Sequence, residues 1–177
     1  MLEEHAKLLG LIRHAGEIVG RKKLQKMIYI LKKLNYPFQE KFQFHFYGPY
    51  SEELTLKIEE LCNLNLMDEL KEEKGGYHQY RYTLTEQGER FLSHYEIDMP
   101  GIDALVQTLN GQNARFLELV STVLYFNNLP KEAVIEKVKV VKQKQHYSDE
   151  EIDEAFRFIA SLQKAAAETG ASSHFHL

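Results

Sequence analysis

The residue types that could carry catalytic chemistry are few in this sequence. Cys62 is the single cysteine, and helical periodicity places it on the inner side of a helix with Ile58 and Leu61. That position favours a buried structural thiol, because nucleophilic cysteines lie in exposed, electropositive surroundings. A single cysteine also excludes an internal disulfide and is typical of a reducing compartment.

Metal and phosphate chemistry have equally little support. Of the eight histidines, only His174 and His176 have the spacing of metal ligands, and no carboxylate or cysteine accompanies them. Gly75-Gly76 is typical of a hairpin turn, not of a phosphate-binding loop. The acidic pairs at Glu52 and Asp149 indicate helix starts, where carboxylates suit the helix dipole. The sequence therefore predicts a non-enzymatic protein with no metal and no cofactor.

The elements that would position any site alternate between helices and strands. Apolar periodicity predicts a helix over residues 3–14 and a second helix from Arg21 to about residue 34. Residues 42–47 alternate as a strand with a phenylalanine face, and Ser51 caps a third helix. A hairpin follows, over residues 66–72 and 77–84, and Thr85 caps the next helix. We expect strand 42–47 to close a three-stranded sheet with this hairpin, and Gly48-Pro49 to break the strand.

That order of elements is typical of a winged helix. The sequence thus predicts an α+β, mostly helical protein, with a winged-helix-like domain over residues 1–98 that contains a three-stranded wing sheet. "DMPGID", residues 98–103, marks a boundary. Residues 99–168 are predicted to form a helical extension that includes a capping box at Ser148, and residues 169–177 a flexible tail. The valine-rich helix after Pro130 makes a homodimer the expected assembly.

Two stretches, "GRKKLQKMIYILKKL" and "FHFYGPYSEEL", are similar to motifs of known families. They resemble the YwgA family of bacterial proteins over most of the chain. More distantly, residues 21–61 resemble the SocA-like (Panacea) antitoxin and adaptor domains, although no Trp precedes the Gly-Pro here. The resemblance implies a role in binding and regulation. It implies no substrate, ligand or reaction.

The third helix decides between partners. Its outward face is predicted to carry acidic side chains around Leu56, and Lys57 is the only basic residue from 51 to 64. Carboxylates repel phosphates, whereas an apolar centre with a charged rim is typical of small protein interfaces. We therefore expect a protein partner at Tyr47, Gly48, Pro49, Tyr50, Glu52, Leu56 and Glu59. Alternatively, the two tyrosines pack on the first strand and seal the core, and Gly48 serves only a positive φ.

Nucleic acid is the alternative partner. Phosphates could contact the face of the second helix opposite its apolar side, where Lys22, Lys26, Tyr29 and Lys33 form a stripe, together with the wing. The candidate residues are Arg21, Lys22, Lys26, Lys33, Lys74, His78 and Arg81. A solvated lysine face is the favoured interpretation of the same stripe.

Charge and hydropathy limit the remaining classes. The net charge is −4, and residues 1–98 (14 Lys/Arg, 16 Asp/Glu) and 99–177 (8 and 10) each contribute −2. Neither part is a basic module. No apolar run has the length of a membrane span, and the N-terminus carries acids where a signal peptide is basic. We expect a cytoplasmic protein without membrane contact.

Overall fold

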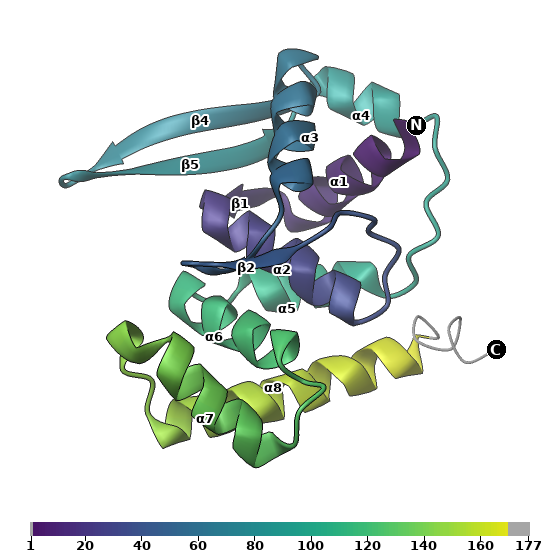
Figure 1. The fold of residues 1–177 in the computed structure, drawn as a ribbon. Coiled ribbons are helices and arrows are strands. Elements are labelled where there is room, and N and C mark those ends of the chain that lie inside the picture. The colour runs from purple at the N-terminus through teal and green to yellow at the C-terminus, as the bar shows by residue number, and fades with distance from the viewer. Residues whose placement is uncertain (1, 170–177) are drawn as a thin grey trace.

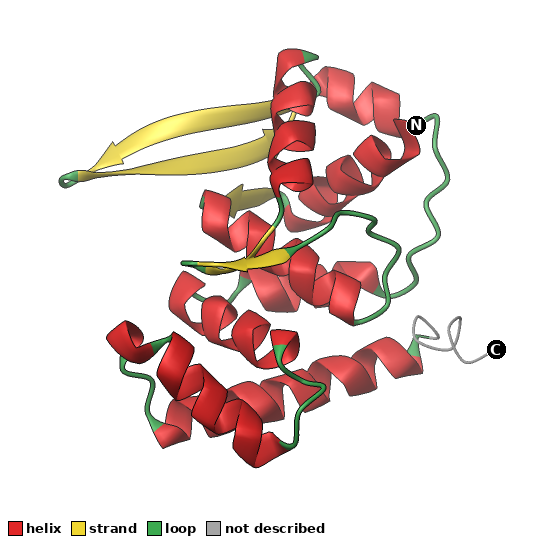
Figure 2. Cartoon of the chain, viewed as in Figure 1, coloured by secondary structure: helices red, strands yellow, loops and turns green. Residues whose placement is uncertain are grey.

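The computed structural model describes residues 2–169, which form helices and two small antiparallel sheets (Figures 1 and 2). Helix α1 (Leu2–Ala15) leads through strand β1 (Glu17–Val19) into α2 (Arg21–Lys33). A hairpin of β2 (Gln43–His45) and β3 (Gly48–Tyr50) precedes α3 (Glu52–Asn63). The longer hairpin, β4 (Met67–Lys74) and β5 (Tyr77–Leu84), leads into α4 (Glu86–Leu92).

The remaining elements are helical. They are α5 (Ile102–Asn110), α6 (Ala114–Tyr125), α7 (Lys131–Val141), a 3-10 turn η1 (Gln143–Gln145) and α8 (Asp149–Glu168). Of these, α6, α7 and α8 lie together at the bottom of the view in Figure 1. Helix α6 packs against α2, and α5 packs against α1 and α2. One cluster of buried apolar side chains therefore extends across the predicted boundary at residues 98–103. No helix of residues 2–169 combines the length and apolarity needed to cross a membrane.

The helix starts follow the predicted caps. Ser51 Oγ accepts from the amide of Leu54 at 3.1 Å, and Thr85 Oγ1 accepts from the amide of Gly88 at 2.8 Å. Ser148 and Glu151 form the predicted capping box. Each cap satisfies an amide that the first helical turn leaves without an intrahelical partner, so the chain enters these helices at defined residues.

The predicted sheet is corrected in its first strand. The three-stranded sheet has the order β1-β5-β4, in which Ile18 pairs with Tyr82. The strand predicted over residues 42–47 does not join it, because its first part is β2, which pairs only with β3. The chain reverses at Phe46 and Tyr47, and Gly48-Pro49 lies within β3. The Gly75-Gly76 turn of the long hairpin is confirmed, with positive φ at both glycines.

Candidate functional site

The segment from Tyr47 to Tyr50, here called the corner, is fastened to α2 by a side-chain amide. Gln25 Nε2 donates to the carbonyl of Ser51 and the amide of Ser51 donates back to Gln25 Oε1, both at 2.9 Å. This pair of bonds satisfies a buried backbone unit as a sheet neighbour would. Gln25 Nε2 also lies 3.1 Å from Thr55 Oγ1, which is 2.8 Å from the hydroxyl of Tyr50.

Two buried lysines donate hydrogen bonds to backbone carbonyls in and just before the corner. Lys26 Nζ donates to the carbonyl of Pro49 at 2.7 Å, and Lys142 Nζ donates to the carbonyl of Phe46 at 2.9 Å. Glu118 of α6 lies 3.5 Å from Lys142 Nζ. The corner thus packs against both α2 and the helical extension, since Lys142 directly follows α7.

The burial of Lys26 corrects the predicted lysine stripe. Lys26 is only 2% exposed and Tyr29 only 5%, because α6 covers that side of α2. Tyr29 packs edge-on against Phe42, with ring centroids 5.1 Å apart. Burial lowers the pKa of Lys26 from 10.5 to about 8, with Glu118 opposing the shift and the nearby lysines Lys142 and Lys22 adding to it. Lys22 and Lys33 are exposed, as predicted.

The corner residues divide between surface and core. Tyr47 is 46% exposed, and Lys22 Nζ sits 3.3 Å from the centre of its ring. Tyr50 is half-buried, while Gly48 and Pro49 are buried. Gly48 has φ +88°, so the predicted need for a positive φ is confirmed. Of the four corner residues, Tyr47 is therefore the one that offers an exposed ring to a partner, and the adjacent Phe46 is 69% exposed.

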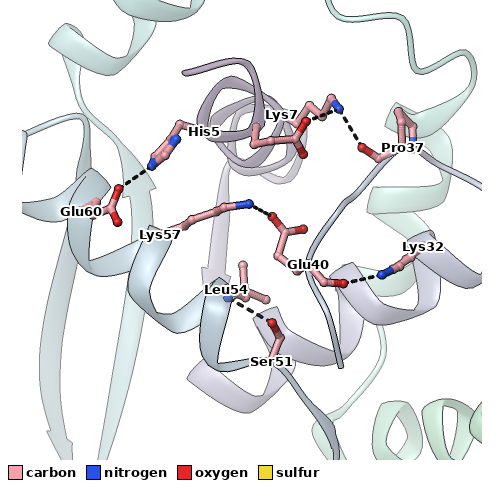
Figure 3. Close-up of polar contacts among 10 residues, drawn as sticks. His5, Lys7, Lys32, Pro37, Glu40, Ser51, Leu54, Lys57 and Glu60 are labelled. Carbon is pink, nitrogen blue, oxygen red and sulfur yellow. Dashed lines mark hydrogen bonds and ion pairs between the residues drawn. The ribbon is translucent and has the colours of Figure 1, made fainter. Parts of the chain in front are cut away.

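The outward face of α3 is acidic around an apolar centre. Leu56 is 57% exposed, and Glu52 and Glu59 are exposed with it. Lys57, the basic residue of this helix, turns away and binds the buried carboxylate of Glu40, with Nζ 2.6 Å from Oε2 (Figure 3). Its charge is thereby neutralised inside the protein.

Further polar contacts join α3 and α1 to the chain around them (Figure 3). His5 Nε2 lies 2.8 Å from Glu60 Oε2, and Lys7 Nζ donates to Glu4 and to the carbonyl of Pro37. Lys32 Nζ donates to the carbonyl of Glu40. Glu40 has no exposed surface, and its Oε1 has no hydrogen-bond partner in the part of the chain that the structure describes. These contacts fix the orientation of α3, and hence of Leu56.

A groove of about 570 Å³ lies between α2, α3, the corner and the base of the β4–β5 hairpin, which the sequence predicted as the wing. Its walls combine aromatic rings with charged groups. They include Lys22, Lys26, Tyr47, Tyr50, Ile58, Cys62, Glu69 and Tyr82. Cys62 is half-buried and lines this groove, whereas the sequence predicted a fully buried position. Burial raises the pKa of its thiol to about 11, and neighbouring carboxylates add to the shift.

Several of the basic residues proposed for nucleic acid are occupied by carboxylates. Arg21 lies 3.4 Å from Glu69 and stacks on the ring of Tyr80 at 3.6 Å. Arg81 pairs with Glu72 at 3.1 Å and also with Glu17. Hydrogen bonds from Arg81 and from Gln79 lower the pKa of Glu72. Lys74 and His78 are exposed near the turn of the β4–β5 hairpin.

Sequence reasoning missed the residues that make the corner rigid. Gln25 lies next to apolar positions in α2 and shows no motif by itself. Lys142 acts on a carbonyl that is 96 positions away along the chain. Glu40 is in a loop with no periodic pattern, so its burial had no local signal. The aromatic and Gly-Pro pattern did identify the corner, although not its supports.

Metal-ligating side chains do not gather anywhere within residues 2–169 in groups of three or more. His174 and His176, the pair with ligand-like spacing, lie outside the described residues. The flexible tail predicted over residues 169–177 also lies outside the described residues, except for Thr169.

Comparison with known proteins places the sequence among bacterial relatives. The chain is 58% identical over 164 residues to a Bacillus subtilis (strain 168) protein named "Uncharacterized protein YwgA", and the match covers 93% of this chain and 99% of that protein. No family model matches the chain. The resemblance to SocA-like domains stays a prediction.

Proposed function

The chain belongs to the YwgA family, and we propose that it is a non-enzymatic regulatory protein that binds a partner protein through the outward face of α3. The proposal treats α1, α2, α3 and the β1-β5-β4 sheet as a scaffold of winged-helix type. The chain order of these elements supports that assignment. In such a scaffold the third helix is the usual reading element.

One observation carries the proposal: Leu56 is exposed at the centre of an acidic helix face whose only lysine is bound internally. Glu52, Glu53, Glu59 and Glu60 are exposed around it, while Lys57 pairs with Glu40. A phosphate backbone needs cations that can release counterions. An apolar side chain within a polar rim instead suits a partner protein with a complementary apolar pocket and basic residues.

Tyr47 extends this surface beside the groove. Its ring is held by Lys22 and its backbone neighbours are fixed by the buried lysines. A pre-organised aromatic side chain loses little entropy on binding, which favours it as an anchor.

The test compares two exposed leucines. Leu56→Asp should abolish recovery of a partner from native lysate, because it places a carboxylate in the apolar centre of the contact. Leu129→Asp is the matched control, since Leu129 is exposed in the loop between α6 and α7. It should retain the partner.

A duplex DNA shift assay at two salt concentrations examines the alternative. We expect no steeply salt-dependent binding, because Lys26 is buried and both Arg21 and Arg81 have carboxylate partners. DNA would become the favoured partner over protein if the binding were steeply salt-dependent, weakened by Lys22→Gln and unaffected by Leu56→Asp. The predicted homodimer remains a proposal alongside, with Val140 of α7 71% exposed.

A further inference from the structure

The groove between α2 and α3 has the dimensions of a small-molecule site. Its volume of about 570 Å³ falls within the range of roughly 300–1,000 Å³ that is usual for such pockets. Its walls come from α2, the corner, α3 and the base of the β4–β5 hairpin. The bonds of Gln25, Lys26 and Thr55 fix the walls from α2, the corner and α3 relative to one another.

The two ends of the groove differ in charge balance. At the hairpin end, Glu69 already binds the guanidinium of Arg21 and accepts from the hydroxyl of Tyr82 at 2.7 Å. At the corner end, Lys22 and Lys26 both line the groove, while Glu118 lies 3.5 Å from Lys142. Lys22 has no carboxylate at ion-pair distance within residues 2–169, and its ammonium rests on the ring of Tyr47. The corner end thus has an excess of positive charge.

Hydrogen-bond capacity points in the same direction. An ammonium group has three donors, and Lys26 Nζ uses one on the carbonyl of Pro49. The first turn of α2, which forms this wall, contains no acid and has no side-chain cap. Its positive dipole end adds to the field of the lysines.

Beside these lysines, the lining of the groove includes aromatic and apolar side chains. The rings of Tyr47 and Tyr50 and the side chain of Ile58 line it. Tyrosine rings favour flat aromatic bodies, which stack on their faces. A ligand for this groove therefore needs an apolar, preferably planar body together with a negative group.

We propose that the groove binds a small molecule in which one anionic group, a carboxylate or a phosphate, is attached to an aromatic body. The anionic group contacts Lys22 and Lys26, and the body lies between Tyr50 and Ile58. This site shares Tyr47 and Glu59 with the proposed partner surface, but Leu56 does not line the groove. Its occupancy does not require a partner protein.

A pair of fluorescent probes tests the charge requirement. 8-Anilinonaphthalene-1-sulfonate carries an anionic group on an aromatic body, and N-phenyl-1-naphthylamine has the same rings without it. The anionic probe should bind saturably and more tightly than the neutral one. Lys22→Gln should weaken the anionic probe by about tenfold, as expected for a lost hydrogen bond to a charged group, and leave the neutral probe unchanged.

Lys33→Gln is the matched control, because Lys33 is an exposed lysine at the far end of the same helix. It should bind both probes as the unmodified protein does. Since Lys22 is exposed, neither substitution removes a buried contact, and far-UV circular dichroism confirms that each variant is folded. Equal affinity for the two probes, or equal effects of the two substitutions, would overturn the proposal.

Cys62 reports where the probe binds. It is the single cysteine of the chain and it lines the groove. Maleimide labelling of Cys62 should therefore slow when the anionic probe is bound. Unchanged labelling would place the probe elsewhere and contradict the site. Competition by 1-naphthoate and by 1-naphthyl phosphate then distinguishes a carboxylate site from a phosphate site.

Discussion

At the scale of single residues, the corner depends on polar side chains that the core has enclosed. A lysine buried without an ion-pair partner loses hydration, and this loss favours its neutral form. Lys26 is buried in this way, and its ammonium donates one hydrogen bond to the carbonyl of Pro49. The same residue was predicted as a surface contact, because periodicity marks the side opposite the apolar face without showing that α6 covers it.

The burial of Lys26 predicts a pH dependence of stability. Below pH 8 the lysine is protonated in both the folded and the unfolded state, so the full desolvation cost is present. Between pH 8 and 10.5 the unfolded state holds more protons, and the free energy of unfolding therefore rises with pH. Relative to Lys26→Met, the wild-type protein should gain about 2 kcal/mol between pH 7 and 9.5.

Urea unfolding followed by far-UV circular dichroism measures this difference, since the chain has no tryptophan. Subtracting the Lys26→Met variant cancels the titration of residues common to both proteins. Lys164→Met, which alters an exposed lysine of α8, should track the wild-type pH dependence. A parallel response of wild type and Lys26→Met would show that Lys26 does not titrate in this range.

At the scale of elements, the β2–β3 hairpin and α2 form one unit. Gln25 and Lys26 of "KLQK" bind the backbone at Ser51 and Pro49 of "YGPYS". The two stretches that carry the family resemblance are therefore two sides of one contact. Their pairing in the sequence has a structural cause, whatever the corner also binds.

Substitutions at two hairpin glycines can distinguish the cost of backbone strain from the cost of overpacking. Gly48 has φ +88° and Gly76 has φ +95°, and a Cβ fits at both, with 3.5 Å to Thr122 Oγ1 at Gly48 and open space at Gly76. Gly48→Ala and Gly76→Ala should each lower the free energy of unfolding by about 1–2 kcal/mol, from backbone strain alone.

Valine at the same two positions tests how tightly each glycine is packed. Gly48→Val meets Thr122 and Lys26 and should cost about 1–3 kcal/mol more than Gly76→Val, because it overpacks a filled space. Chemical denaturation of the four variants gives the comparison. Equal costs for the two valine variants would show that the corner is not held tightly against α2 and α6.

At the scale of the whole molecule, the helices and the β4–β5 hairpin were predictable from the sequence, but the strand that completes the three-stranded sheet was not. Caps such as Ser51 and Thr85 mark helix starts with local hydrogen bonds, so sequence alone placed them. The three-residue strand β1 has no periodic pattern, and its partner β5 lies more than 60 residues away. Phe42, Phe44 and Phe46 alternate convincingly, yet alternation does not identify which strand is the neighbour.

The candidate site divides in the same way. The exposure of Leu56 could be predicted from the helical periodicity of residues 52–63, and that of Tyr47 from the Gly-Pro that follows it. Each of these signals depends on a few adjacent residues. The groove required α2, α3, the corner and the base of the β4–β5 hairpin to be placed together. The support from Lys142 required the helical extension to fold back on the corner.

The shared core predicts how the chain unfolds as a whole. Helices α5 and α6 cover α1 and α2 with fully buried side chains such as Val106, Leu109, Leu117 and Val120. Removing several such residues, at about 2–5 kcal/mol each for leucine-sized groups, exceeds the roughly 5–15 kcal/mol that stabilises a typical domain. A fragment of residues 1–98 should therefore lack a cooperative thermal transition, although the sequence marks a boundary there.

Mixing it with a fragment of residues 99–177 should restore helical circular dichroism and one transition, because the two complete a common core. A cooperative transition of fragment 1–98 alone, at the temperature of the full chain, would instead show that the boundary separates independent folding units.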